Sequence, residues 1–131
     1  MTPSVTHRIQ RVLIVEDSTE DAWLLEWALQ ELAPEVHVQV IFDSFTALPV
    51  LQQPDPPDLL VLDLHLVHHT GLEVLEALNR QVGPSPRVVC WSSHAHPQEV
   101  AAVLEAGALA YVQKPPGVTG FLELAQTLLQ G

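Results

Sequence analysis

The chain has 131 residues, of which 47% are hydrophobic, and it carries a formal net charge of -11. This length fits one domain with a substantial core, and no apolar run approaches the ~18 residues that a membrane span needs. The excess of acidic residues argues against binding to nucleic acid or to an anionic membrane through a basic patch, and it permits a cation site.

Apolar runs alternate along the chain with segments of helical period. Ser18 with Asp21 resembles a capping box, Pro49 weakens a predicted helix, and Gly107 follows the end of another. In chain order we expect strands at 11–16, 37–42, 58–64, 87–92 and 109–113, and helices at 19–32, 44–53, 71–80, 97–106 and 119–129. Five strand–helix units predict an α/β fold, in which helices cover both faces of a parallel sheet.

The two ends of the chain and its single cysteine bear on domain organisation and compartment. The N-terminal segment has neither an apolar core nor a cleavage site, so we expect no signal peptide. We expect residues 1–7 to be flexible and residues 8–131 to form one domain without an output domain. Cys90 lies in an apolar run, which predicts a buried thiol in a protein of a reducing compartment, the cytoplasm.

Polar side chains end four of the predicted strands. Glu16 and Asp17 end the first, Asp63 the third, Ser92 the fourth and Lys114, the only lysine, the fifth. Because the binding site of such sheets lies beyond the carboxyl ends of the strands, we expect these groups to converge on one edge.

This set of residues predicts phosphoryl chemistry. Carboxylates held close together favour a bound cation, and oxygen ligands suit a hard ion such as Mg²⁺. An aspartate there can act as a nucleophile toward phosphorus and form an acyl phosphate. Lys114 and Ser92 would supply the positive charge and the positioned donor that phosphoryl transfer needs. A cis Lys114–Pro115 bond would make the corner that aims the lysine a tight one.

Four segments, VLIVEDSTEDAWLLEWAL, DLLVLDLHLVHHTG, VVCWSSH and EAGALAYVQKP, resemble the receiver domains of two-component response regulators. The similarity runs from Arg11 to about Leu129. It implies a flavodoxin-like, doubly wound sheet of five parallel strands, (βα)5, in the order 2-1-3-4-5. It also implies a single-domain response regulator that takes a phosphoryl group from a histidine kinase.

The resemblance implies a role for each matching residue. Asp63 would be the phosphoacceptor. Asp17, Asp63 and the backbone carbonyl of His65 would ligate Mg²⁺, and Glu16 would act largely through water. Ser92 and Lys114 would each bind a phosphoryl oxygen.

The resemblance also implies how the signal would leave the site. Tyr111 would be the switch residue, turning inward as Ser92 moves. The surface formed by segments 97–106, 109–113 and 119–129 would then change. Such a protein is not an enzyme in the metabolic sense, although it assists its own phosphorylation and autodephosphorylation.

Five histidines follow the two strands that end in Asp63 and Ser92. They could be exposed polar residues of two loops, or they could tune the site or bind a transition metal. His65 and His94 match the family positions that tune phosphate lifetime, and we expect them to do so here. The five are His65, His68, His69, His94 and His96.

The last predicted helix, 119–129, has a wider apolar surface than one packed face needs. Either it is well buried or it forms a partner surface, and we favour a homodimer through the surface of segments 97–106, 109–113 and 119–129. The segment VEDSTEDAWLLEWAL also resembles stand-alone receivers that accompany phytochrome-type histidine kinases.

Other functions remain to be weighed against a signalling switch. A Mg²⁺-dependent phosphatase with an aspartyl nucleophile would share the chemistry, but those enzymes carry Asp-x-Asp after the first strand, where this chain has adjacent acids. An interaction module that is not phosphorylated would not need Asp63, Ser92 and Lys114 together. A flavin-binding protein would need a phosphate loop after the first strand, and none is evident there.

Overall fold

The computed structural model describes residues 9–130, so the predicted flexible segment 1–7 lies outside the described residues. Five parallel strands form one sheet in the order β2-β1-β3-β4-β5, and this confirms the predicted fold class. The strands are β1 (Arg11–Val15), β2 (His37–Ile41), β3 (Leu59–Asp63), β4 (Arg87–Ser92) and β5 (Ala110–Gln113). The helices are α1 (Thr19–Leu32), α2 (Ser44–Leu51), α3 (Gly71–Asn79), α4 (Pro97–Glu105) and α5 (Val118–Gln130).

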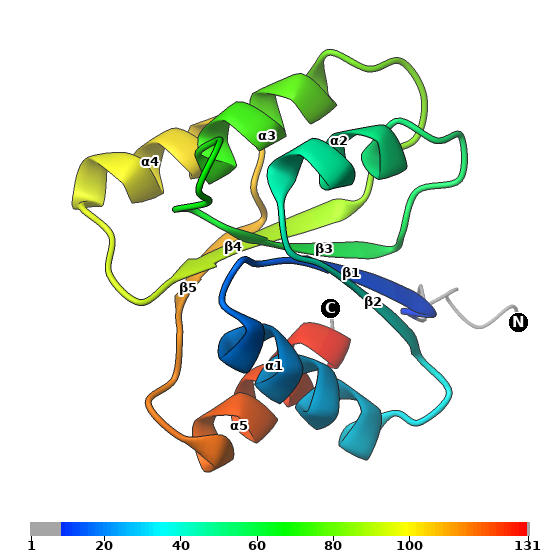
Figure 1. Cartoon of the computed structure of the whole chain (residues 1–131), viewed down its shortest axis with the longest axis vertical. Coiled ribbons are helices and arrows are strands. Elements are labelled where there is room, and N and C mark those ends of the chain that lie inside the picture. Colours follow the sequence, from blue (N-terminus) through cyan, green and yellow to red (C-terminus); the bar gives the residue numbers. More distant parts are fainter. Residues whose placement is uncertain (1–8, 131) are drawn as a thin grey trace, which may run out of the picture.

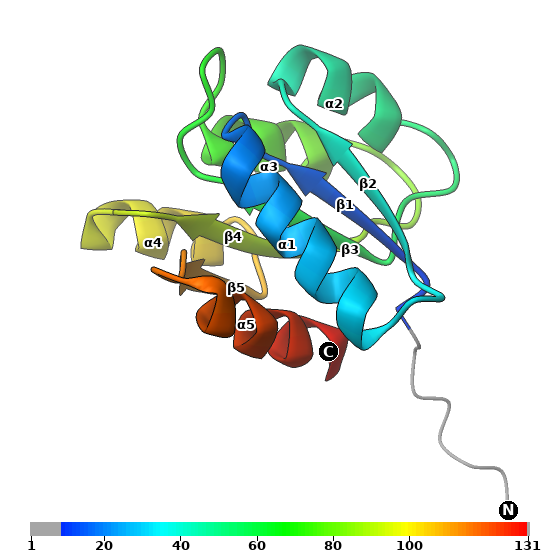
Figure 2. The same ribbon diagram turned by 60° about the horizontal axis from the view of Figure 1, so that its bottom comes forward.

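Helices cover both faces of the sheet, with α1 and α5 on one face and α2, α3 and α4 on the other (Figures 1 and 2). Side chains of a strand alternate between the two faces. In β1, Val12 and Ile14 join the core under α1 and α5, and Leu13 and Val15 join the other core. Burial on both faces explains why the central strands β1, β3 and β4 read as unbroken apolar runs rather than as alternating patterns.

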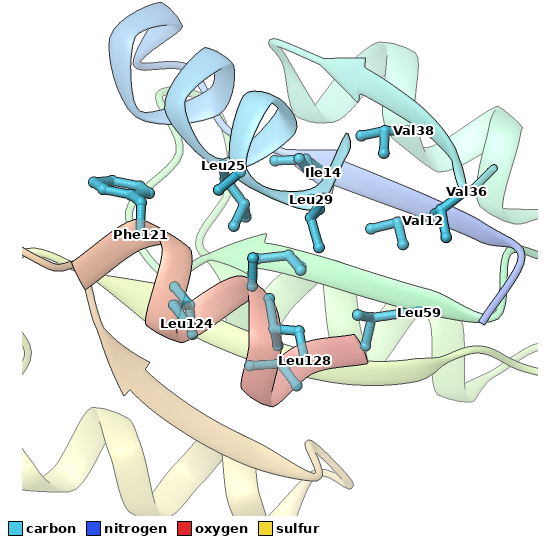
Figure 3. Close-up of a cluster of buried hydrophobic side chains, with 14 of the residues drawn as sticks. Val12, Ile14, Leu25, Leu29, Val36, Val38, Leu59, Phe121, Leu124 and Leu128 are labelled. Carbon is cyan, nitrogen blue, oxygen red and sulfur yellow. The ribbon is translucent and has the colours of Figure 1, made fainter. Parts of the chain in front are cut away.

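The apolar residues of helix α5 pack against helix α1 and the sheet (Figure 3). Phe121, Leu124 and Leu128 are buried in the cluster that also contains Leu25 and Leu29 of α1. The simpler interpretation of the wide apolar surface, a well-buried terminal helix, is therefore the one that the packing supports. No helix within residues 9–130 is long and apolar enough to cross a membrane.

The helices begin and end close to the residues predicted from the sequence. Gly107, two residues beyond α4, has a φ of 108°, a backbone conformation that side chains with a Cβ rarely adopt. Helix α2 contains Pro49 and ends at Leu51, before the predicted residue 53. All peptide bonds between the described residues are trans, so the Lys114–Pro115 corner contains no cis bond.

The capping box predicted at the start of α1 was wrong in one half. The Ser18 hydroxyl does accept a hydrogen bond from the backbone N–H of Asp21, at 3.4 Å. The box is not completed, because the Ser18 backbone N–H donates to Glu16 Oε2 at 3.0 Å and the Asp21 carboxylate is paired with Lys114 at 3.0 Å. The acid at this position therefore faces the strand ends rather than its own helix.

Candidate functional site

The strand ends bring the three predicted carboxylates together. Glu16 directly follows β1, and Asp63 is the last residue of β3; both are buried. One oxygen each from Glu16, Asp17 and Asp63 lies within 4.8 Å of the others. This acidic cluster, of hard oxygen donors only, could bind a metal ion of the kind that Mg²⁺ and Mn²⁺ exemplify.

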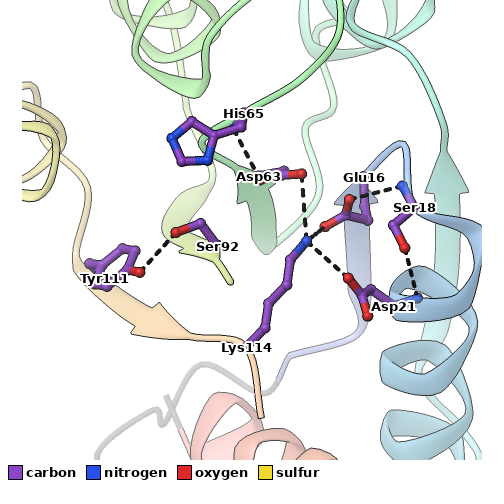
Figure 4. A network of polar contacts seen from close by, with 8 residues as sticks. All are labelled: Glu16, Ser18, Asp21, Asp63, His65, Ser92, Tyr111 and Lys114. Carbon is purple, nitrogen blue, oxygen red and sulfur yellow. Dashed lines mark hydrogen bonds and ion pairs between the residues drawn. The ribbon is translucent and has the colours of Figure 1, made fainter. Parts of the chain in front are cut away.

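Lys114 reaches into this cluster from the end of β5 (Figure 4). Its Nζ lies 2.7 Å from Glu16 Oε1, 3.0 Å from Asp21 Oδ2 and 3.6 Å from Asp63 Oδ2. Its backbone N–H donates to the Ser92 carbonyl at 2.8 Å, which fixes the strand from which the side chain departs. The lysine is thus placed where the sequence predicted, and Asp21 is a partner that the sequence interpretation missed.

Burial governs the electrostatics of the cluster. It raises the pKa of Glu16 to about 8, and the neighbouring Asp63 adds to this rise while Lys114 opposes it. Burial alone would lower the pKa of Lys114, but its pairs with Glu16, Asp63 and Asp21 raise it above the usual value. A carboxyl group that is costly to ionise gains from a bound cation, so the residues present fit a divalent metal.

Ser92 and Tyr111 form a second contact at the same edge of the sheet (Figure 4). Their hydroxyl oxygens are 2.8 Å apart, with Ser92 buried at the end of β4 and Tyr111 half-buried in β5. The predicted hydroxyl and the predicted switch residue therefore touch each other. A change at Ser92 would reach Tyr111 without an intermediary.

His65 connects the end of β3 to helix α4. Its backbone N–H donates to Asp63 Oδ1 at 3.0 Å, and its Nε2 lies 2.7 Å from Glu99 Oε2. The Glu99 side chain also accepts from the backbone N–H of His96 at 2.9 Å, and these two contacts hold the pKa of Glu99 below its ordinary value. One side chain thus bridges the loop after β3 to the first turn of α4.

The remaining loop histidines belong to no cluster of three or more potential metal ligands in the described part of the chain. His68 and His69 pack against Phe45 of α2, with ring centroids 4.8 Å and 4.9 Å from it. The rings of His94 and His96 are 5.7 Å apart. Within residues 9–130, only the acidic cluster brings three or more potential ligand side chains together, so the transition-metal hypothesis for these histidines finds no support.

Two buried residues of β4, Cys90 and Trp91, lie near the site; the burial of the first was predicted, and the contact of the second with Lys114 was not. Cys90 is buried as predicted, and burial raises the pKa of its thiol to about 12, which leaves it inert. Trp91 was not predicted as a site residue. Lys114 Nζ lies 5.1 Å from the centre of its ring, at cation–π distance. The available signal was an aromatic residue directly before Ser92 in a strand next to β5.

A sheet of order 2-1-3-4-5, with an acid cluster, a hydroxyl and a lysine at its carboxyl edge, defines the receiver class of signalling domains. The family model of the response regulator receiver domain matches residues 12–126. The chain belongs to this family, which serves phosphorylation-dependent signalling in two-component systems.

Known relatives place receivers in different protein contexts. A Myxococcus xanthus protein-glutamate methylesterase/protein-glutamine glutaminase is 39% identical over 106 residues, which cover 80% of this chain and 30% of that protein. Response regulator Rcp1 of Synechocystis is 28% identical over 123 residues, covering 88% and 83% of the two chains. The chain therefore spans under a third of the methylesterase and most of Rcp1.

Solved structures agree with the fold. The Mn²⁺-bound form of Rcp1 superposes with a TM-score of 0.76 at 25% identity, over 91% of each chain. The phosphorylated cyanobacterial phytochrome response regulator RcpA superposes with a TM-score of 0.78 at 23% identity, over 92% of this chain and 91% of its own.

Proposed function

We propose that this protein is a response regulator that accepts a phosphoryl group from a histidine kinase on Asp63. The observation that carries the proposal is the position of Lys114, the only lysine, whose Nζ lies 3.6 Å from Asp63 Oδ2 inside the acidic cluster. A carboxylate and an ammonium so placed serve attack on phosphorus and neutralisation of the transferred group.

Asp17, Asp63 and the backbone carbonyl of His65 would hold Mg²⁺, with Glu16 acting largely through water. The ion would neutralise charge on the phosphoryl oxygens. In the transfer, an Asp63 carboxylate oxygen forms a bond to phosphorus as the bond from phosphorus to the donor breaks, and the donor leaves with that electron pair. Lys114 and Ser92 bind phosphoryl oxygens. Hydrolysis of the acyl phosphate returns the free carboxylate.

The output would pass through Ser92 and Tyr111 to the surface of α4, β5 and α5. The contact between the two hydroxyl oxygens supports this route, because a Ser92 turned toward a phosphoryl group would leave Tyr111 without that partner.

We also propose that the surface of α4, β5 and α5 forms a homodimer. Leu104, Leu109 and Val118 support it, being 44%, 61% and 51% exposed. Sedimentation velocity would detect the dimer, and a monomer in both phosphorylation states would contradict it.

The kinase is proposed to be of the phytochrome type, and the site of action the cytoplasm. The first proposal draws on the segment VEDSTEDAWLLEWAL and on the likeness in fold to RcpA. The second draws on the single buried thiol. Neither changes the chemistry proposed for Asp63.

The test is the intact mass of the protein after incubation with a small-molecule phosphodonor, with Mg²⁺ or with a chelator. We expect one phosphoryl adduct with Mg²⁺ and a loss of at least about tenfold in its rate of formation without the ion. Inorganic phosphate is measured in parallel. Sustained rapid release at many turnovers would favour the alternative of a phosphatase with an aspartyl nucleophile. Neither adduct nor release would favour an interaction module that is not phosphorylated.

We expect His65 and His94 to tune the lifetime of the phosphorylated state. We expect His65→Ala to change the dephosphorylation rate by about two- to tenfold, because it removes the bridge to Glu99 from the residue whose backbone N–H donates to Asp63. We expect a change for His94→Ala as well. The rate is read from the decay of the phosphoryl adduct.

Glu99→Gln is the matched variant for the bridge, since it keeps the size of the side chain but removes the charge that faces His65. If the bridge matters, it should reproduce much of the His65→Ala effect. Unchanged lifetimes in both histidine variants would contradict the proposed tuning.

A further inference from the structure

Asp21 is a carboxylate of the site that belongs to neither the predicted ligands nor the acidic cluster. It lies in the first turn of α1, where its backbone N–H is held by the Ser18 hydroxyl. Its Oδ2 is 3.0 Å from Lys114 Nζ, whereas the nearest Asp63 oxygen is 3.6 Å away. The lysine therefore sits closer to Asp21 than to the residue that it is proposed to serve (Figure 4).

The ammonium group of Lys114 is enclosed by partners that hold it in place. The side chain is only 9% exposed, and its ammonium touches the buried Glu16 on one side and faces the Trp91 ring at 5.1 Å. Trp91 is itself fixed by the Phe121 ring, whose centroid is 6.0 Å away. Among these partners, the Asp21 carboxylate is the one nearest to solvent, at 27% exposure.

We propose that Asp21 is a positioning residue that tethers Lys114 in the unphosphorylated protein, and that this contact is released when the lysine binds a phosphoryl group on Asp63. The inference deepens the proposed function and rests on it. Asp21 touches neither the phosphoacceptor nor the metal ligands in any described contact, and it acts through the lysine alone.

The pair between Asp21 and Lys114 should slow phosphorylation, because the ammonium charge is needed at the phosphoryl group on Asp63. A phosphoryl group on Asp63 places its oxygens beyond that carboxylate, so Lys114 must give up part of its resting arrangement to reach them. An interaction that stabilises the resting state more than the transition state slows the reaction. Because Asp21 is partly exposed, its pair with Lys114 is weaker than a fully buried one and can be exchanged.

Asp21→Asn should therefore accelerate phosphorylation by a small-molecule phosphodonor about three- to tenfold at fixed pH and Mg²⁺. The increase should appear in the limiting rate rather than in the half-saturating donor concentration, because Asp21 acts on the lysine. Asp21→Glu, which retains the charge, should bring the rate back toward that of the wild type. An unchanged or slower rate in Asp21→Asn would overturn the inference.

Glu20→Gln is the matched control. Glu20 precedes Asp21 in the same turn of α1, is exposed, and has no contact with Lys114 in the described structure, yet the substitution removes the same unit of charge. It should leave the limiting rate within about twofold of the wild type. An acceleration equal to that of Asp21→Asn would assign the effect to net charge and overturn the tether.

A second readout needs no phosphorylation. Because Lys114 is the only lysine, selective ¹³C labelling of lysine gives one ε-methylene signal in an NMR spectrum. Asp21→Asn should shift this signal at fixed pH, and Glu20→Gln should leave it in place. An unmoved signal in Asp21→Asn would overturn the inference, whereas failure of the wild type to take up phosphate would overturn the proposed function and leave this readout standing.

Discussion

Asp63→Asn is expected to abolish the phosphoryl adduct, with a loss of at least about a thousandfold in its rate of formation. The amide has nearly the shape of the carboxylate, but its oxygen is a far weaker nucleophile. The substitution also removes one of the three carboxylates that could hold the cation. Since Asp63 contributes to the raised pKa of Glu16, that pKa should fall toward its ordinary value. Intact mass spectrometry with phosphodonor and Mg²⁺ measures the loss.

Asp55→Asn serves as the control for this experiment. Asp55 is exposed and pairs with Arg11 at 2.8 Å, outside the acidic cluster. The control should acquire one phosphoryl group at the wild-type rate. A stoichiometric adduct on the Asp63→Asn chain would contradict Asp63 as the phosphoacceptor, and circular dichroism would show that the variant is folded.

The layout of the sheet was predictable because parallel strands buried on both faces leave a strong pattern. The run LLVLD of β3 is buried at every position, and it ends in Asp63, a member of the acidic cluster. Once the strands were placed, the rule that sites lie at their carboxyl ends located Glu16, Asp17, Asp63, Ser92 and Lys114 without knowledge of any contact. The structure places Ser92 and Tyr111 in contact, and the switch role implied by the resemblance stays a prediction.

Contacts between side chains on different elements were not predictable in the same way. Asp21 looked like half of a capping box because local spacing is what a sequence displays, and its actual partner is 93 residues further on (114 minus 21). The bridge from His65 to Glu99 spans 34 residues. The apolar surface of α5 was ambiguous for a related reason, because period alone does not say how much of a helix its neighbour α1 will cover.

Gly71 connects the stability of the fold to the geometry of the site. It is the first residue of α3, and its N–H donates to the Leu64 carbonyl at 2.8 Å. A Cβ at this position would lie 2.6 Å from the Asp63 carbonyl oxygen and 2.9 Å from the Leu64 Cα. Both are backbone atoms, so no side-chain rotation relieves the contact.

Gly71→Ala should therefore destabilise the protein by about 2–4 kcal/mol and also slow phosphorylation. Alanine favours a helix over glycine by about 1 kcal/mol, but this gain is smaller than the cost of moving packed backbone. The backbone that must move carries Asp63, so the proposed phosphoacceptor would shift relative to Lys114. Urea denaturation gives the free energy of unfolding.

The control is Gly117→Ala, where an added Cβ has no neighbour within 4 Å and should change stability by less than about 1 kcal/mol. Equal stability of the two variants would show that the start of α3 can move away from β3, and phosphorylation of Gly71→Ala at the wild-type rate would show that Asp63 does not depend on that packing.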